Sequence, residues 1–183
     1  MAIQKGCLLI TDDLPTREIG RLLGFEKSAW LHQVFNVALN TKRLDFDAFI
    51  RWTAHLVDAG HGYIGVSAHV LARSAALDSE AGEAPSYLFK TLSQVIGGGV
   101  AEPRSHIIAV VGCLREVWTE PSRKPYREAI TGILLRQLIR ERKEDYIAIL
   151  RAVQFHVRDL QALTDYLELW ARGHFLPATT LAA

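Results

Sequence analysis

Residues 7–17 read CLLITDDLPTR, a short apolar run that ends on two carboxylates and is followed by the start of a helix. A run of four apolar residues that is followed by polar residues is typical of a strand buried on both faces. Asp12 and Asp13 are of a type that caps helices, and Gly24 is typical of a helix end. The stretch therefore predicts a buried strand whose carboxyl end carries two aspartates at the beginning of a helix.

The two aspartates allow two interpretations. Carboxylates at the carboxyl end of a strand lie where open α/β sheets bind their ligands, and they are common ligands of hard metal ions. Aspartate is also a frequent N-cap, so the simpler interpretation is that one of the pair caps the helix and the other is solvated. The spacing alone favours this simpler interpretation.

The composition predicts a globular protein in a reducing, cytoplasmic setting. The chain has 183 residues, 49% of them hydrophobic, and a net charge of +1, so it is large enough for a packed core. Cys7 and Cys113 are far apart in apolar surroundings, which argues against a disulfide framework and against a zinc site. Neither a run of about eighteen apolar residues nor a signal-peptide core is present, so no membrane association is expected.

The predicted fold class is mostly α: a small α/β lobe with a short two-stranded parallel sheet, followed by an all-helical C-terminal region. Helices are predicted over 14–24, 29–42 and 46–59, with Gly60 closing the third and Ser28 capping the second. The β-rich segment Tyr63–Ser67 predicts the second strand. Two strands joined by a helical crossover are usually parallel neighbours in one sheet.

The acidic, apolar-poor segment from Asp78 to Pro85 predicts a linker. It divides the chain into a lobe at residues 1–77 and a helical region at residues 86–183. A helix is predicted from near Ala68, and further helices over 86–96, 103–119, 125–142 and 144–172, the last as one helix or two. The apolar side chains of the last segment recur at intervals of three and four residues, which is typical of a helix face that packs in the core.

Charge is unevenly distributed along the chain. Residues 123–158 contain nine Lys or Arg against four Asp or Glu. Arg136, Arg140 and Lys143 fall on one helical face, which could hold a phosphate backbone or simply form a solvated surface. The seven histidines are scattered without a pair at the spacing of a helical metal site, so each is interpreted as a surface or core residue.

One combination of motifs points to a known family. It comprises the apolar strand into Thr11-Asp12-Asp13, the helix with Arg17 that ends in Leu22-Leu23-Gly24, and the apolar helix around Trp30-Leu31. It continues with Leu44-Asp45-Phe46-Asp47, a helix ending in Asp58-Ala59-Gly60-His61, and the segment Tyr63–Ser67. Over residues 7–73 this combination resembles the C-terminal half of a PIN domain.

The resemblance implies a metal-dependent nuclease. PIN domains use Mg²⁺ or Mn²⁺ to cleave, usually, single-stranded RNA, with three or four acidic residues around the metal. By this resemblance Asp12 or Asp13 matches the last of these acids, as a catalytic metal ligand, and Arg17 lies in the helix that follows. A complete PIN domain has further acids on earlier elements that have no counterpart in this sequence. The implied site therefore needs an upstream segment or a partner protein to complete it.

These observations lead to two functional hypotheses. The first is the C-terminal part of a PIN-like ribonuclease, inactive alone, whose helical second half serves as an interaction or RNA-holding module. Its predicted RNA contacts are Arg17 in the lobe and Arg136, Arg140 and Lys143 in the helical region. The second is a non-catalytic helical interaction or regulatory module that keeps a residual α/β lobe. No family is recognised for residues 85–175.

Overall fold

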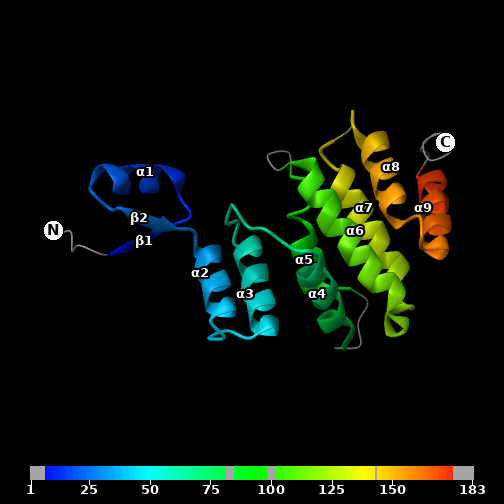
Figure 1. Ribbon diagram of the computed structural model, residues 1–183, viewed down its shortest axis with the longest axis horizontal. Coiled ribbons are helices and arrows are strands. Elements are labelled where there is room, and N and C mark those ends of the chain that lie inside the picture. The colour runs from blue at the N-terminus through cyan, green and yellow to red at the C-terminus, as the bar shows by residue number, and fades with distance from the viewer. Residues whose placement is uncertain (1–6, 81–84, 99–101, 143, 175–183) are drawn as a thin grey trace. The chain divides into compact units, whose positions relative to one another are not determined.

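The computed structural model describes residues 7–80, 85–98, 102–142 and 144–174 (Figure 1). The chain divides into two compact units, unit 1 at residues 1–65 and unit 2 at residues 66–183. Unit 1 holds a small sheet with three helices, and the described part of unit 2 is helical. The predicted fold class is therefore confirmed. The division between the units falls before Val66, ahead of the segment predicted to be a linker.

The sheet of unit 1 consists of two short parallel strands. β1 (Leu8–Ile10) and β2 (Lys27–Ala29) are joined by α1 (Leu14–Leu22), and Leu8 lies opposite Lys27. The parallel two-stranded sheet was predicted, but the choice of Tyr63–Ser67 as the second strand is wrong. Tyr63 has a φ of +57°, a left-handed conformation that a strand does not accommodate.

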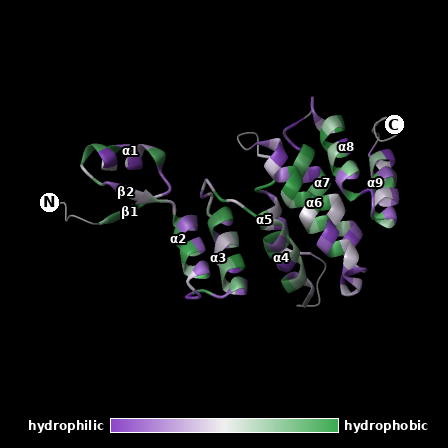
Figure 2. Cartoon of the chain, in the orientation of Figure 1, coloured by the Kyte–Doolittle hydropathy of each residue, from purple (hydrophilic) through white to green (hydrophobic). Residues whose placement is uncertain are grey.

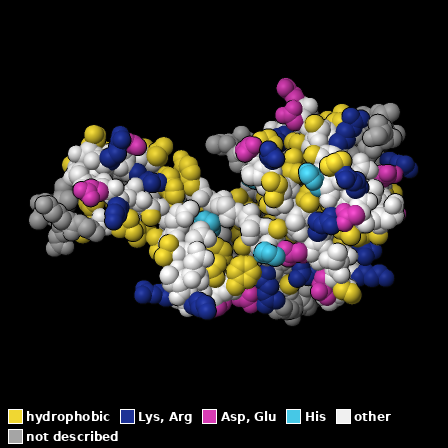
Figure 3. Space-filling model, viewed as in Figure 1, with side chains coloured by type: hydrophobic (Ala, Val, Ile, Leu, Met, Phe, Trp, Pro, Cys, Tyr) yellow, Lys and Arg dark blue, Asp and Glu magenta, His cyan; other side chains and the backbone are white. Residues whose placement is uncertain are grey.

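The prediction that β1 is buried on both faces is also wrong. Leu8 is 50% exposed and Ile10 46% exposed, and the buried residue of α1 is Gly20. One crossover helix cannot cover both faces of a sheet, so apolar side chains remain at the surface (Figure 3). We call the exposed large apolar side chains of β1, α1 and the residue after α1 the exposed apolar residues of unit 1: Leu8, Ile10, Leu14, Ile19, Leu22 and Leu23.

The other two helices of unit 1 are α2 (Leu31–Asn40) and α3 (Phe46–Asp58), which pack against each other. The beginning and end of α3 are confirmed, because Asp45 Oδ1 accepts the N–H of Ala48 at 2.8 Å and Gly60 follows with a φ of +77°. The beginning predicted for α2 is wrong. Ser28 lies in β2 and its hydroxyl accepts a hydrogen bond from Arg17 Nε at 3.1 Å, so the helix starts only at Leu31.

Unit 2 is built around its longest helix, α6 (Pro103–Thr119). It packs against α4 (Ala68–Glu80), α7 (Arg127–Ile139) and α8 (Tyr146–Val157), while α5 (Tyr87–Ser93) lies on α4 and α7, and α9 (Gln161–Gly173) on α8. A 3₁₀ turn, η1 (Pro121–Arg123), follows α6. Hydrophobic and hydrophilic residues alternate along α9 (Figure 2), which has one buried and one exposed side.

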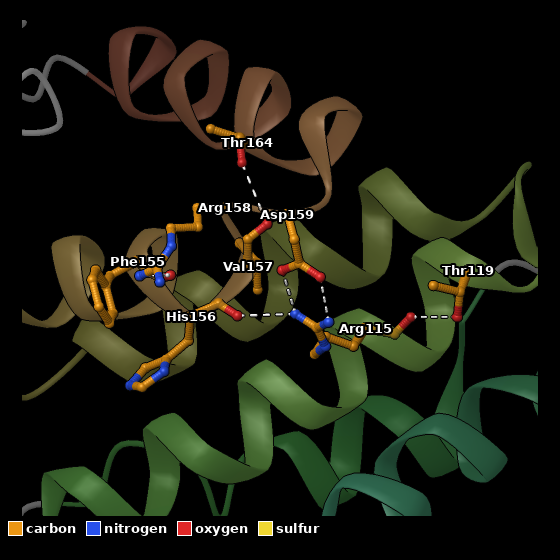
Figure 4. A network of polar contacts seen from close by, with 8 residues as sticks. All are labelled: Arg115, Thr119, Phe155, His156, Val157, Arg158, Asp159 and Thr164. Atoms are coloured by element: carbon orange, nitrogen blue, oxygen red, sulfur yellow. Dashed lines mark hydrogen bonds and ion pairs between the residues drawn. The ribbon is translucent and has the colours of Figure 1, made fainter.

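The predicted helix over 144–172 is two helices. Arg115 of α6 makes two hydrogen bonds to Asp159, at 2.7 and 2.5 Å, and a third to the carbonyl of His156 at 3.0 Å (Figure 4). The partners lie at the end of α8 and in the turn that follows it. This ion pair therefore joins the turn between α8 and α9 to the central helix.

The segment predicted to be a linker contains a structural residue. Asp78 lies in α4, is buried, and accepts the backbone N–H groups of Ser86, Leu88 and Phe89 at 2.9, 3.3 and 3.0 Å. Its carboxylate thus caps α5, whose own Ser86 makes no side-chain cap. Residues 81–84 of the segment lie outside the described residues.

The two cysteines differ in environment. Cys113 is fully buried in α6, and burial raises the pKa of its thiol. Cys7 is exposed, although apolar residues follow it in the sequence. In the part of the chain that the structure describes, no helix has both the length and the apolar character needed to cross a membrane.

We expect Gly97→Ala to destabilise unit 2 strongly. Gly97 has a φ of +87°, and a Cβ there would lie 1.8 Å from the backbone oxygen of Gln137, so the loss should exceed about 2 kcal/mol. The adjacent Gly98 is the matched control, because the nearest heavy atom to a Cβ there is 4.0 Å away. Urea denaturation followed by circular dichroism measures both, and equal losses would contradict the prediction.

A buried histidine predicts acid sensitivity in unit 2. His106 Nδ1 accepts the N–H of Gly97 at 3.0 Å and lies 3.1 Å from Arg142 Nη2. Burial, and then the positive charge of Arg142, lower the pKa of His106. Protonation therefore favours the unfolded state, whose imidazole has its ordinary pKa of about 6.5, and stability should fall as pH drops below that value.

His106→Asn should flatten this pH dependence. The asparagine Oδ1 can accept the Gly97 N–H but does not titrate. The urea midpoint of the parent should fall more than that of the variant between about pH 7.5 and about pH 5.5. An identical pH dependence in the two proteins would show that His106 is not the group responsible.

Candidate nucleic-acid interface

Asp12 connects three segments of unit 1. Its Oδ1 accepts the N–H of Leu31 at 2.8 Å, and its Oδ2 lies 2.5 Å from Nδ1 of His61. The side chain is only 12% exposed. Leu31 is the first residue of α2, and the preceding Trp30 makes no side-chain cap. Asp12 therefore caps α2 from the end of β1 and at the same time holds the loop after α3.

The end of α3 fixes the position of His61. The N–H of Gly60 bonds to the carbonyl of Val57, and the N–H of His61 bonds to the carbonyl of Leu56, both at 3.0 Å. With Gly60 in the left-handed conformation, this is the Schellman pattern of helix termination. The imidazole thus reaches Asp12 from a backbone position that the helix end defines.

Asp13 caps the helix that follows it. It accepts hydrogen bonds from the backbone N–H of Thr16, at 2.7 Å, and from the Thr16 hydroxyl. These bonds lower the pKa of Asp13. The capping interpretation is therefore confirmed for Asp13, but Asp12 is not simply solvated, because it is engaged at both oxygens.

The described residues contain no group of three or more His, Cys, Asp or Glu side chains that could hold a metal ion. His32, on the first turn of α2, is buried, and burial lowers its pKa against the opposing effect of Asp12. Its Nε2 is buried and has no hydrogen-bond partner within the described residues. The assignment of Mg²⁺ or Mn²⁺ to Asp12 and Asp13 stays a prediction.

Next to Asp12 lies a stack of three side chains. The guanidinium of Arg17 lies 3.7 Å from the centre of the Trp30 ring, and the Tyr63 ring stacks on Trp30 at a centroid distance of 4.1 Å and an angle of 18°. Tyr63 is 58% exposed. We call Arg17, Trp30 and Tyr63 the aromatic stack. The Tyr63 ring of the stack is exposed to solvent, and the Arg17 guanidinium over Trp30 adds a positive charge.

Sequence reasoning missed three residues of this region. Trp30 was assigned to the apolar face of a helix, Tyr63 to a strand, and His61 to the surface or core. A usable signal was the glycine-rich run from Gly60 to Gly65 around Tyr63. Such a run is typical of a turn, in which the side chains between the glycines are exposed to solvent. Nothing local to Trp30 indicates that a ring from 33 positions later stacks on it.

The basic stripe belongs to unit 2. Arg136 lies in the last turn of α7 and Arg140 at its C-cap, and both are exposed. Arg140 donates to the carbonyl of Gln94 at 3.3 Å and lies 3.5 Å from the carboxylate of the adjacent Glu141. Lys143 lies outside the described residues. Arg136 and Arg140 are thus surface cations, which fits either interpretation of the stripe.

Comparison of the chain with protein-family models, curated proteins and solved structures gives no significant match. The PIN-domain resemblance therefore stays a prediction.

Substitutions should separate the roles of the two aspartates. Asp12→Ala leaves the N–H of Leu31 without its acceptor, and we expect it to destabilise unit 1 by about 1–3 kcal/mol. Asp13→Asn should have little effect, because asparagine caps helices as well as aspartate does. Hydrogen exchange of the Leu31 amide, measured by NMR, should accelerate only in Asp12→Ala. Acceleration by Asp13→Asn of the same size would contradict the assignment.

Proposed function

We propose that unit 1 binds single-stranded RNA through the aromatic stack, as the C-terminal part of a PIN-like ribonuclease that does not cleave RNA alone. The observation that carries this proposal is the exposed Tyr63 ring, stacked on Trp30 with Arg17 at 3.7 Å from the same indole. An exposed ring on a rigid support is the feature on which proteins stack unpaired bases.

The composition of the stack favours a single-stranded polyanion. Each stacked base contributes about 1–3 kcal/mol by alanine substitution, with little dependence on its identity. Arg17 is held by its bond to Ser28 and by the Trp30 ring, so little rotamer freedom remains to be lost on binding. Its charge attracts the phosphate backbone that accompanies the stacked base.

The proposed lack of autonomous cleavage rests on the carboxylates. Metal-assisted hydrolysis of a phosphodiester needs several ligands around one or two cations, whereas Asp12 caps α2 and Asp13 caps α1. Each carboxylate oxygen has two lone pairs, so Asp12 retains acceptor capacity. Asp12 would contribute one ligand once further acids are supplied by another segment or a partner chain.

A second candidate function, a protein-interaction module, is favoured by the exposed apolar residues of unit 1. Leu22 is 82% exposed, and five further large apolar side chains of this group are also at the surface. Large exposed apolar areas commonly mark a protein contact. Unit 1 would then be a scaffold element, with the aromatic stack serving only to hold its loops together.

Tyr63→Ala should weaken the binding of a single-stranded oligonucleotide of about twelve nucleotides by about tenfold, because it removes the exposed ring. Tyr63→Phe should retain binding. Trp52→Ala is the matched control, because Trp52 is an exposed aromatic residue of α3 in the same unit. Fluorescence anisotropy over a salt series measures the affinities, and Arg17→Gln should reduce the salt dependence.

The outcomes of this experiment distinguish the candidates. Equal losses in Tyr63→Ala and Trp52→Ala, or no binding by the parent, would contradict the RNA proposal and leave the interaction module. If Arg136→Ala/Arg140→Ala alone abolishes binding, the RNA contact lies in unit 2. Cleavage by the parent with Mn²⁺ that is lost in Asp12→Asn/Asp13→Asn would show that the chain is active by itself.

A further inference from the structure

Only one of the two ring nitrogens of His61 is used in holding unit 1 together. Its Nδ1 lies 2.5 Å from Oδ2 of Asp12. Within the described residues Nε2 makes no hydrogen bond or ion pair, and it is not one of the buried atoms that lack a partner. Nε2 is therefore in contact with solvent, in a side chain that is 34% exposed. His32, the other histidine near Asp12, differs because its unpartnered Nε2 is buried.

Asp12 fixes the tautomer of the His61 imidazole. A carboxylate only accepts hydrogen bonds, so the nitrogen that faces it, Nδ1, carries a hydrogen. In the neutral imidazole the other nitrogen then has a lone pair and no hydrogen. Asp12 is itself held in place, because its Oδ1 accepts the N–H of Leu31 at 2.8 Å. Nε2 of His61 is consequently a hydrogen-bond acceptor that faces solvent.

This acceptor lies beside the aromatic stack. Two residues of chain span at most about 7 Å, so the backbone of His61 is within that distance of the backbone of Tyr63. Trp30 directly precedes Leu31, whose N–H is bound by the same carboxylate as His61. A nucleotide whose base stacks on the exposed Tyr63 ring therefore has its sugar in the neighbourhood of His61.

The sugar carries the group that distinguishes RNA from DNA, the 2′-hydroxyl, which can donate a hydrogen bond. We propose that Nε2 of His61 accepts a hydrogen bond from the 2′-hydroxyl of a nucleotide bound at the aromatic stack, and that this contact makes unit 1 selective for RNA over DNA. His61 is then a specificity residue, and Asp12 is the residue that positions it. The proposal rests on the proposed binding of single-stranded RNA to the stack, and it adds the group that is recognised.

Fluorescence anisotropy at pH 8 with three cytosine dodecamers, of RNA, DNA and 2′-O-methyl RNA, tests the proposal. The parent should bind the RNA about fivefold more tightly than the DNA, which corresponds to one hydrogen bond. The 2′-O-methyl oligomer should bind like the DNA, because it keeps the 2′ oxygen but has no hydrogen to donate. His61→Ala should remove the preference for RNA. His55→Ala is the matched control and should keep it, because His55 is an exposed histidine of α3 in the same unit.

Asp12→Asn separates recognition by the tautomer from a purely structural role. The asparagine oxygen can still accept the Leu31 N–H, but its amide then donates to Nδ1 of His61, so the ring hydrogen moves to Nε2. With a donor at this position, the variant should bind RNA and 2′-O-methyl RNA with equal affinity. The loss of a negative charge acts on all three oligomers alike, so the ratio of affinities is the readout. A ratio of RNA to 2′-O-methyl RNA that is the same as in the parent would overturn the proposal.

The remaining outcomes separate this proposal from the proposed function. Equal affinities of the parent for RNA and DNA, with both weakened by Tyr63→Ala, would overturn the selectivity and leave RNA binding to the stack in place. A preference that survives His61→Ala, or a loss in His55→Ala equal to that in His61→Ala, would also overturn the role of His61. Binding of neither oligomer by the parent would contradict the proposed function and the selectivity with it.

Discussion

Unit 1 depends on one carboxylate. Asp12 follows the end of β1, and through it the strand end, the first turn of α2 and the loop after α3 meet at a single side chain. The two strands have three residues each, and an isolated pair of that length has little stability of its own. A part-buried polar link between segments far apart in sequence therefore helps to hold unit 1 in place, as the pairing of further strands does in a larger sheet.

The same link arranges the aromatic stack. Trp30 precedes Leu31, whose N–H is bound by Asp12, and Tyr63 follows His61, whose imidazole is bound by the same carboxylate. The two rings are thus attached to two backbone positions that one side chain holds together. Arg17 comes from the helix that begins directly after the aspartates. The geometry of the proposed RNA contact is consequently coupled to the capping of α2, although Asp12 itself is not one of its contacts.

The sequence predicted the features that local chemistry controls. Asp45 and Gly60 bound α3, Asp13 caps α1, and Pro103 begins α6, because caps and helix breakers act within a few residues. The second strand and the beginning of α2 were predicted wrongly for the opposite reason. Asp12 caps a helix 19 positions away, and Tyr63 is left-handed where it stacks on Trp30. Such pairings depend on tertiary packing, which no local pattern encodes.

The contrast between the two cysteines has a practical consequence for labelling. The thiolate is the nucleophile that attacks reagents such as maleimides, and the Cys113 thiol is both fully buried and shifted toward its protonated form. Cys7 is exposed immediately before β1. The native chain therefore accepts a single fluorophore or spin label at the edge of unit 1, and no cysteine has to be removed first. Unfolding of unit 2 would expose the Cys113 thiol and make it reactive. The number of labels per chain therefore measures the fraction of molecules in which unit 2 has unfolded around Cys113.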